Sequence, residues 1–106
     1  MTEDVSYIDD LSLENYLNSL IGKIYKLLPL RESSQGTFPI YLRGLRDELF
    51  GFTGVVSKFS YDPSYVSILA ILQFLVDSPE CPVEDVRREV FSMISLCKRL
   101  ISKHTN

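Results

Sequence analysis

Cys81, Cys97 and His104 carry side chains that could bind a metal ion or act in catalysis. A zinc site needs about four converging ligands, whereas this chain has a single histidine and its two cysteines lack the CxxC spacing. Cys97 falls on the apolar seam of a predicted helix, which indicates a buried structural thiol. Cys81 precedes the start of that helix, where a thiol pKa is lowered, but the sequence places no base beside it. We therefore expect no metal, no cofactor and no catalytic cysteine.

The spacing of the two cysteines also bears on the compartment of the protein. Cys81 and Cys97 are sixteen residues apart along one predicted helix, a separation of roughly 24 Å that prevents a disulfide between them. The N-terminal residues are acidic and lack the order of a secretory signal. The longest apolar run, 68–76, is far shorter than the roughly 20 residues of a membrane span. These features predict a cytoplasmic protein with reduced thiols.

The short stretch from Gly51 to Gly54 is a candidate phosphate-binding loop because a glycine stands at each end of it. Such loops follow a strand and precede a lysine, and the sequence predicts neither at this place. A bend or break in a helix is the better interpretation, because each glycine costs a helix about 1 kcal/mol relative to alanine.

Arg99 and His104 are separated by four residues near the end of the last predicted helix. This spacing resembles the Arg-x4–6-His signature of the HEPN ribonucleases, which are compact helical bundles. The resemblance implies a ribonuclease in which Arg99 and His104 together stabilise the scissile phosphate and transfer protons at a dimer cleft. Leu100 stands where that family usually has a polar residue after the arginine. This ribonuclease is the alternative to a non-catalytic function.

Arg43 and Arg46 lie on a mixed-charge face of the second predicted helix. Arg43 can pair with Asp47 one turn later, as expected of a solvated face. The two arginines also lie between two aromatic residues, Tyr41 and Phe50. Arginine beside aromatics is typical of binding surfaces. Arg43 and Arg46 are therefore either solvated side chains or the polar rim of an interface.

The positions of apolar residues predict the elements that carry these side chains. Four segments repeat apolar residues at steps of three and four, the period of a helix, and no segment alternates with the period of a strand. The four seams are Leu13, Leu17, Leu20, Ile24 and Leu27; Phe38, Leu42, Leu45, Leu49, Phe52, Val56 and Phe59; Tyr65, Leu69, Leu72 and Val76; and Val83, Val86, Val90, Met93, Cys97 and Leu100.

Proline and capping residues mark the ends of these helices. Pro29 is expected to end the first helix, and Pro39 suits the first turn of the second. Asp62-Pro63 is a strong start signal for the third, which should stop at Ser78-Pro79. For the second helix, one long helix and two shorter ones separated near Gly51–Gly54 both fit. The prediction is a single all-α domain over 1–106, an up-and-down antiparallel four-helix bundle, with 1–9 as a loose lead-in.

Charge and composition narrow the class of partner. The chain has 11 Lys and Arg against 14 Asp and Glu, a formal net charge of −3, so nucleic acid is not a favoured partner. Hydrophobic residues make up 45% of the sequence, which excludes a disordered chain.

The third predicted helix is apolar nearly all round, because only Ser67 and Gln73 are polar between Tyr65 and Val76. In a four-helix bundle each helix keeps one face in water, so such a helix is expected to be covered by something else. The predicted interface comprises Tyr65, Ile68, Ile71, Phe74 and Leu75, together with Phe50 and Phe91 on neighbouring helices.

These observations lead to a small non-catalytic protein-interaction module, an adaptor, regulator or accessory subunit. We expect it to associate with itself, with another protein, or with both, through the third helix. A small apolar ligand in a cavity of the bundle is compatible with the aromatic content, although no residue pattern is diagnostic of one.

Overall fold

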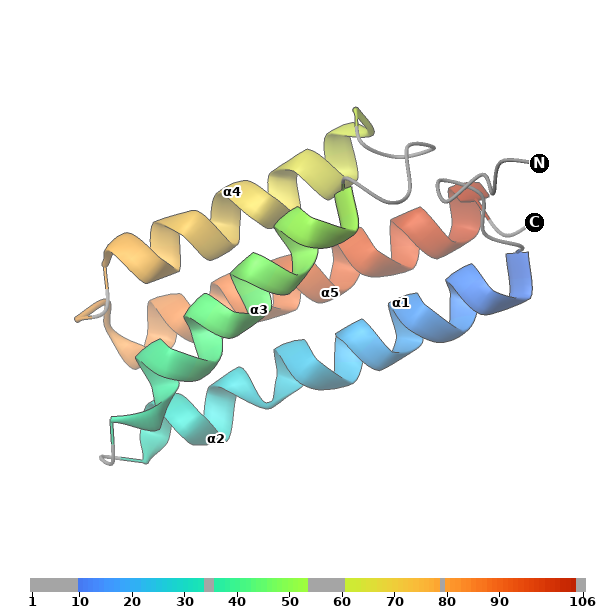
Figure 1. Cartoon of the computed structure of the whole chain (residues 1–106). Coiled ribbons are helices and arrows are strands. Elements are labelled where there is room, and N and C mark those ends of the chain that lie inside the picture. Colours follow the sequence, from blue (N-terminus) through green and yellow to red (C-terminus); the bar gives the residue numbers. More distant parts are fainter. Residues whose placement is uncertain (1–9, 34–35, 54–60, 79, 105–106) are drawn as a thin grey trace.

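The computed structural model of the chain describes residues 10–33, 36–53, 61–78 and 80–104, and they form five helices. These are α1 (Asp10–Tyr25), α2 (Leu27–Glu32), α3 (Thr37–Thr53), α4 (Pro63–Asp77) and α5 (Val83–His104). The described residues contain no strand. Because α1 and α2 follow one another along a single bent arm, the fold is the all-α four-helix bundle that the sequence predicts (Figure 1). The predicted lead-in, 1–9, lies outside the described residues.

The bend between α1 and α2 corrects the expected role of Pro29. Pro29 lies in the first turn of α2 and does not end the helical arm. Proline has no N–H, so the carbonyl of Tyr25 cannot receive the usual helical hydrogen bond from it. The ladder therefore lacks the bond to the Tyr25 carbonyl, whereas Lys26 N still donates to Gly22 O and Leu30 N to Lys26 O, each at 3.3 Å. The proline displaces the helix axis, and the arm continues to Glu32.

The other helix boundaries follow the predicted signals. α3 has Pro39 in its first turn and ends at Thr53, within the predicted break at Gly51–Gly54. Gly54 and the seam positions beyond it lie outside the described residues. At the start of α4, the Asp62 carboxylate accepts a hydrogen bond from Ser64 N at 2.8 Å, with Pro63 as the first helical residue. The Lys103 ammonium binds the same carboxylate at 3.1 Å, which joins the end of α5 to the start of α4.

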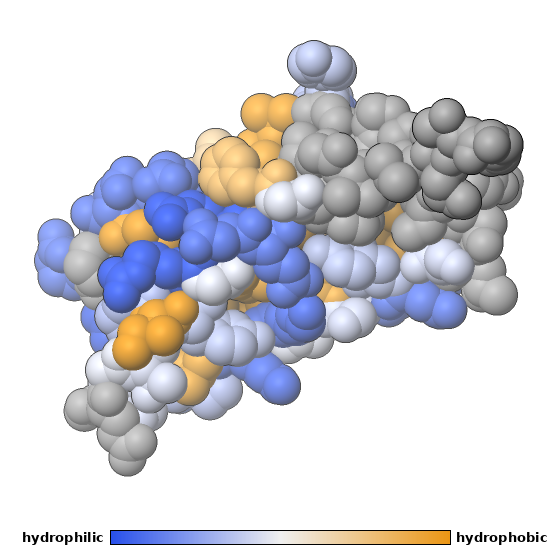
Figure 2. All heavy atoms as spheres, in the orientation of Figure 1, coloured by the Kyte–Doolittle hydropathy of each residue, from blue (hydrophilic) through white to orange (hydrophobic). Residues whose placement is uncertain are grey.

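The four arms run alternately up and down (Figure 1). α5 is central to the packing, because α1, α2 and α4 all lie against it, whereas α3 packs against α4 and α2. α1 and α3 make few close backbone contacts with one another. Seen from the same side, the surface over these two helices is a mosaic in which hydrophilic residues predominate over smaller hydrophobic areas (Figure 2).

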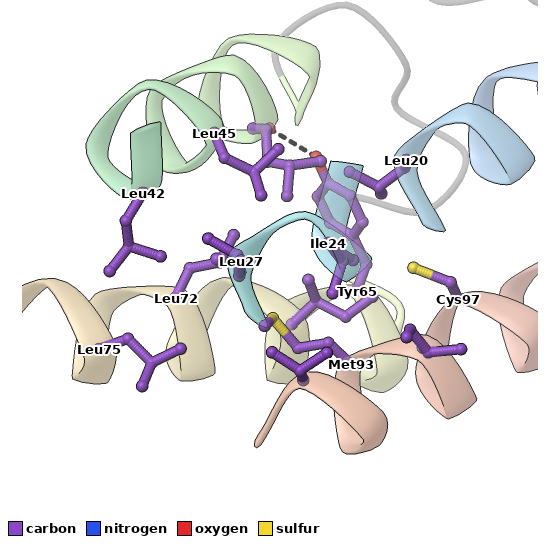
Figure 3. Close-up of a cluster of buried hydrophobic side chains, with 14 of the residues drawn as sticks. Leu20, Ile24, Leu27, Leu42, Leu45, Tyr65, Leu72, Leu75, Met93 and Cys97 are labelled. Atoms are coloured by element: carbon purple, nitrogen blue, oxygen red, sulfur yellow. Dashed lines mark hydrogen bonds between the residues drawn. The ribbon is translucent and has the colours of Figure 1, made fainter. Parts of the chain in front are cut away.

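The core is filled by the predicted seam of α1, by Phe38, Leu42, Leu45 and Leu49 of α3, and by the predicted seam of α5 (Figure 3). Val83 is the exception in the α5 seam, because it is only partly buried. α2 adds Leu27, and Tyr65 stands at the centre, its hydroxyl donating to the backbone carbonyl of Leu49. The buried hydrophobic residues are Leu13, Leu17, Leu20, Ile24, Leu27, Phe38, Leu42, Leu45, Leu49, Tyr65, Ile68, Leu72, Leu75, Cys81, Val86, Val90, Met93, Ile94, Cys97 and Leu100.

The buried face of α4 differs from the predicted seam. Tyr65 and Leu72 are buried as expected, but Ile68 and Leu75 take the places predicted for Leu69 and Val76, which are only partly buried. Both sets repeat at steps of three and four. A helix that is apolar nearly all round therefore does not reveal from its sequence which of two adjacent faces is buried.

Candidate functional site

The predicted interface residues divide into core and surface. Tyr65, Ile68 and Leu75 are at most 1% exposed and belong to the core of the single chain. Their assignment to an interface is therefore wrong, because presenting them to a partner would require opening the bundle. Ile71 is partly buried against the core. Phe74 on α4, Phe50 on α3 and Phe91 on α5 remain about half exposed.

The outward side of α4 forms an uncharged surface, here called the α4 face, made of Pro63, Val66, Ser67, Ala70 and Phe74. All five residues are exposed, with Val66 at 47% and Phe74 at 49%. No charged residue occurs between Pro63 and Val76. The outward side of α5 has the usual composition, with exposed Glu84, Arg87, Arg88, Lys98 and Arg99. The two helices of one chain thus present surfaces of different chemistry.

Phe91 belongs to a different surface from Phe74. Its ring meets that of Tyr25 on α1 edge to face, with centroids 6.0 Å apart and an interplanar angle of 81°. This pair covers part of both rings on the α1–α5 side of the bundle, where such geometry adds about 0.5–1.5 kcal/mol. The Phe91 ring is therefore partly covered by a residue of its own chain.

The two arginines of the predicted polar rim lie along the junction of α3 and α4. Arg46 forms an ion pair with the adjacent Asp47 at 3.0 Å and donates to Gln73 Oε1 on α4 at 3.4 Å. Arg43 is exposed and lines a small cavity of about 120 Å³ between α3 and α4. Both arginines thus lie beside α4, Arg46 as a polar link between the helices.

A second site, the α1–α3 groove, lies where these two helices diverge. The groove has a volume of about 370 Å³ and is lined by Lys23, Lys26, Tyr41, Gly44, Leu45 and Glu48. Leu45 is buried and Tyr41 is partly buried, whereas Gly44 leaves its stretch of α3 without a side chain. An apolar base between polar walls is typical of small-molecule sites.

Hydrogen bonds at Glu48 hold the two sides of the groove together. Lys23 Nζ lies 3.0 Å from both carboxylate oxygens of Glu48, and Tyr16 Oη donates to one of them at 3.0 Å. Tyr41 Oη on α3 donates to the backbone carbonyl of Lys23 at 3.1 Å. Burial and the neighbouring Glu48 carboxylate raise the pKa of Tyr16, so its hydroxyl remains a donor at neutral pH. α1 and α3 are therefore linked by polar side chains across the groove.

The two thiols are not activated, and the Arg99–His104 pair is described only in part. Burial raises the pKa of Cys97 to about 12 and also raises that of Cys81, so neither thiol is activated. Arg99 is exposed on α5, and the side chain of His104 lies outside the described residues. Within the described ranges, no group of three His, Cys, Asp or Glu residues could hold a metal ion. No helix in those ranges combines the length and apolarity needed to cross a bilayer.

Comparison with protein families, with curated proteins and with solved structures finds no match to this chain.

Sequence reasoning missed the α1–α3 groove. Tyr16 and the lining residues Lys23 and Glu48 flank the apolar seams of two different helices. About two turns of helix separate Tyr41 from Glu48. A helical projection would have placed each of them beside the buried stripe. The sequence contains no signal that the two helices diverge at this point.

Proposed function

We propose that this chain is a non-catalytic helical protein-interaction module, an adaptor, regulator or accessory subunit, that self-associates through the α4 face. The observation that supports the proposal is the absence of charge along the exposed side of α4, from Pro63 to Phe74. Surface helices of single-chain bundles normally carry charged residues outward, as α5 does here. An uncharged helix face with two half-exposed large side chains is typical of a helix that packs against a second protein.

A second copy of the chain fits this surface in an antiparallel arrangement. Ala70 lies at the midpoint of the helix, seven residues from Pro63 and seven from Asp77. A twofold axis beside Ala70 brings Val66 and Ser67 of one copy against the Phe74 region of the other, as an isologous interface requires. The small side chains at the centre permit close approach, and the larger ones pack on either side.

Charge at the ends of the helix favours the same arrangement. Asp77 ends α4, where a carboxylate is unfavourable beside the negative end of the helix dipole. In an antiparallel pair it lies beside the start of the partner's α4, which has the positive end of its own dipole. The Lys103 ammonium there is already paired with the Asp62 carboxylate, so the helix dipole is the attracting charge. The ends of two copies are thus complementary.

The expected affinity is modest. Complete burial of a phenylalanine stabilises by about 1.5–3 kcal/mol, and Phe74 is 49% exposed, so each copy gains about 1 kcal/mol from this side chain. Stable dimers usually bury about 1,200–2,000 Å², more than one helix face supplies. We therefore expect dimerisation at tens to hundreds of micromolar protein.

Sedimentation equilibrium or light scattering across this concentration range tests the proposal. Phe74→Lys should weaken dimerisation about thirtyfold, the equivalent of about 2 kcal/mol over two copies. Ser95→Lys is the matched control, because it adds the same charge at an exposed position on the outward side of α5. A wild type that is monomeric at several hundred micromolar, or equal weakening by both variants, would contradict the proposal.

The proposal includes a cytoplasmic location. Both cysteines are free thiols in the structure, and small secreted domains more often carry disulfides. Fractionation of cells that produce the protein tests this part, and recovery outside the cytoplasm would contradict it.

A further inference from the structure

We propose that the α1–α3 groove is a binding site for a small anionic amphiphile, a molecule with an apolar body and one carboxylate. This site is distinct from the α4 face, because it is formed by α1, α3 and the Lys26 link to α2. The inference does not depend on self-association. It depends on the shape, lining and charge of the groove.

The shape of the groove suits a small molecule better than a helix of another protein. Its volume of about 370 Å³ falls within the range of roughly 300–1,000 Å³ found for small-molecule sites. Gly44 leaves the groove open, because the position of an added Cβ has no heavy atom within 4 Å. Leu45 supplies a buried apolar base, and the Tyr41 ring is fixed by its hydrogen bond to Lys23 O. An apolar body can therefore lie over Gly44 between preformed walls.

The charge of the groove selects an anion. The lining contains two lysines and one glutamate, one net positive charge in a chain whose net charge is −3. The Glu48 carboxylate is already engaged by Lys23 and by Tyr16. Lys26 forms no ion pair with any residue that the structure describes. The ammonium of Lys26 is thus the group that a ligand carboxylate can reach without breaking an existing contact.

These features define a pose. The carboxylate binds Lys26 Nζ at the junction of α1 and α2, and the apolar body extends over Gly44 against Tyr41 and Leu45. A cationic ligand would meet the uncompensated ammonium, and an uncharged ligand would lack the ion pair. The predicted order of affinity is carboxylate, then alcohol, then amine at equal chain length.

Titration of the ¹⁵N-labelled protein with octanoate, octan-1-ol and octylammonium, each below its micelle concentration, tests the ligand class. Octanoate should shift the backbone amides of Lys26, Gly44 and Leu45, and it should bind about two- to fivefold more tightly than octan-1-ol, the usual value of a partly exposed ion pair. Octylammonium should bind most weakly. Shifts centred on the α4 face or on Phe91, or equal affinity for octanoate and octan-1-ol, would overturn the proposal.

Two variants test the location. Lys26→Gln should remove the preference for octanoate over octan-1-ol and leave octan-1-ol binding unchanged. An added Cβ at Gly44 meets no heavy atom within 4 Å, so Gly44→Leu should place its side chain in the groove and abolish the binding of both ligands. Gly22→Leu is the matched control, because Gly22 is an exposed helical glycine on α1 that has equal space for a side chain and does not line the groove.

The outcomes can be interpreted even if one variant folds poorly. Circular dichroism shows whether Gly44→Leu is folded. If it is not, the location is decided by the wild-type shift map and by the loss of octanoate preference in Lys26→Gln. Octanoate binding that survives in folded Gly44→Leu, or that is lost equally in Gly22→Leu, would overturn the proposal.

Discussion

The hydroxyl of Tyr65, in the first turn of α4, donates a hydrogen bond to the backbone carbonyl of Leu49, in the C-terminal part of α3. Both side chains are fully buried. The bond therefore links two helices that the chain connects through residues 54–62, and it does so inside the core. It fixes the position of the start of α4 along the axis of α3.

Tyr65→Phe should lower the free energy of unfolding by about 0.5–1.5 kcal/mol, because it removes one buried hydrogen bond and keeps the ring. Urea unfolding monitored by circular dichroism measures the change. Tyr25→Phe is the control, since Tyr25 is 44% exposed and an exposed substitution usually changes stability by less than about 0.5 kcal/mol. Equal effects of the two variants would show that the Tyr65 hydroxyl contributes nothing specific.

Substitution by alanine should change the stability of the fold in opposite directions at two glycines. Gly44 lies inside α3 with open space around an added Cβ, so Gly44→Ala should stabilise the fold by about 1 kcal/mol. Gly36, just before α3, has a φ of +75°, a conformation that costs other residues about 1–2 kcal/mol. Gly36→Ala should therefore destabilise the fold. Thermal unfolding of both variants gives the signs, and a shift of the same sign in both would contradict the prediction.

Cys97 should make stability fall in alkaline solution. Burial raises the pKa of its thiol from 9.0 to about 12. Below pH 9 the thiol is protonated in both states, but between pH 9 and 12 only the unfolded chain releases the proton. The free energy of unfolding then falls, by up to about 1.4 kcal/mol per pH unit. In urea titrations from pH 8 to 11, the stability difference between wild type and Cys97→Ala should narrow, and a constant difference would contradict the assignment.

The Arg99–His104 pair gives a direct test between the two functional classes. We expect purified wild type to cleave single-stranded RNA no faster than His104→Ala, because the proposed module is non-catalytic. Circular dichroism establishes that the variant is folded. RNA cleavage by the wild type that disappears in folded His104→Ala would support the ribonuclease and contradict the proposed function.

The boundaries of α4 illustrate what the sequence could predict. Asp62 and Pro63 act locally, one by accepting a backbone hydrogen bond and the other by its fixed φ, so their effect depends little on the rest of the fold. The same is true of the seam of α1, where only one face of the helix is apolar. At these two places sequence and structure agree, whereas Pro29, also a local signal, bends the helical arm and does not end it.

The disagreements arise where the outcome depends on other helices. α4 offers two apolar faces, and the contacts with α3 and α5 select the one that contains Ile68 and Leu75. Phe74 emerges on the surface by the same selection, whereas Ile71 is partly covered. The α1–α3 groove could not be predicted because helix divergence is a property of the whole bundle, set by the bend at Lys26 and by packing against α5.

Because α1 and α3 are joined by the polar link at Glu48, the bundle should deform more easily between these two helices than around α5. Around α5 the helices are held by apolar packing, which strengthens with each buried side chain. Across the groove α1 and α3 are held by partly exposed ion pairs and hydrogen bonds, each worth about 1 kcal/mol or less. The lowest-energy deformation should therefore be a rotation of α1 away from α3, with the α1–α5 contact as the hinge. Ionic strength, which screens Lys23 from Glu48, would then adjust how readily the bundle opens.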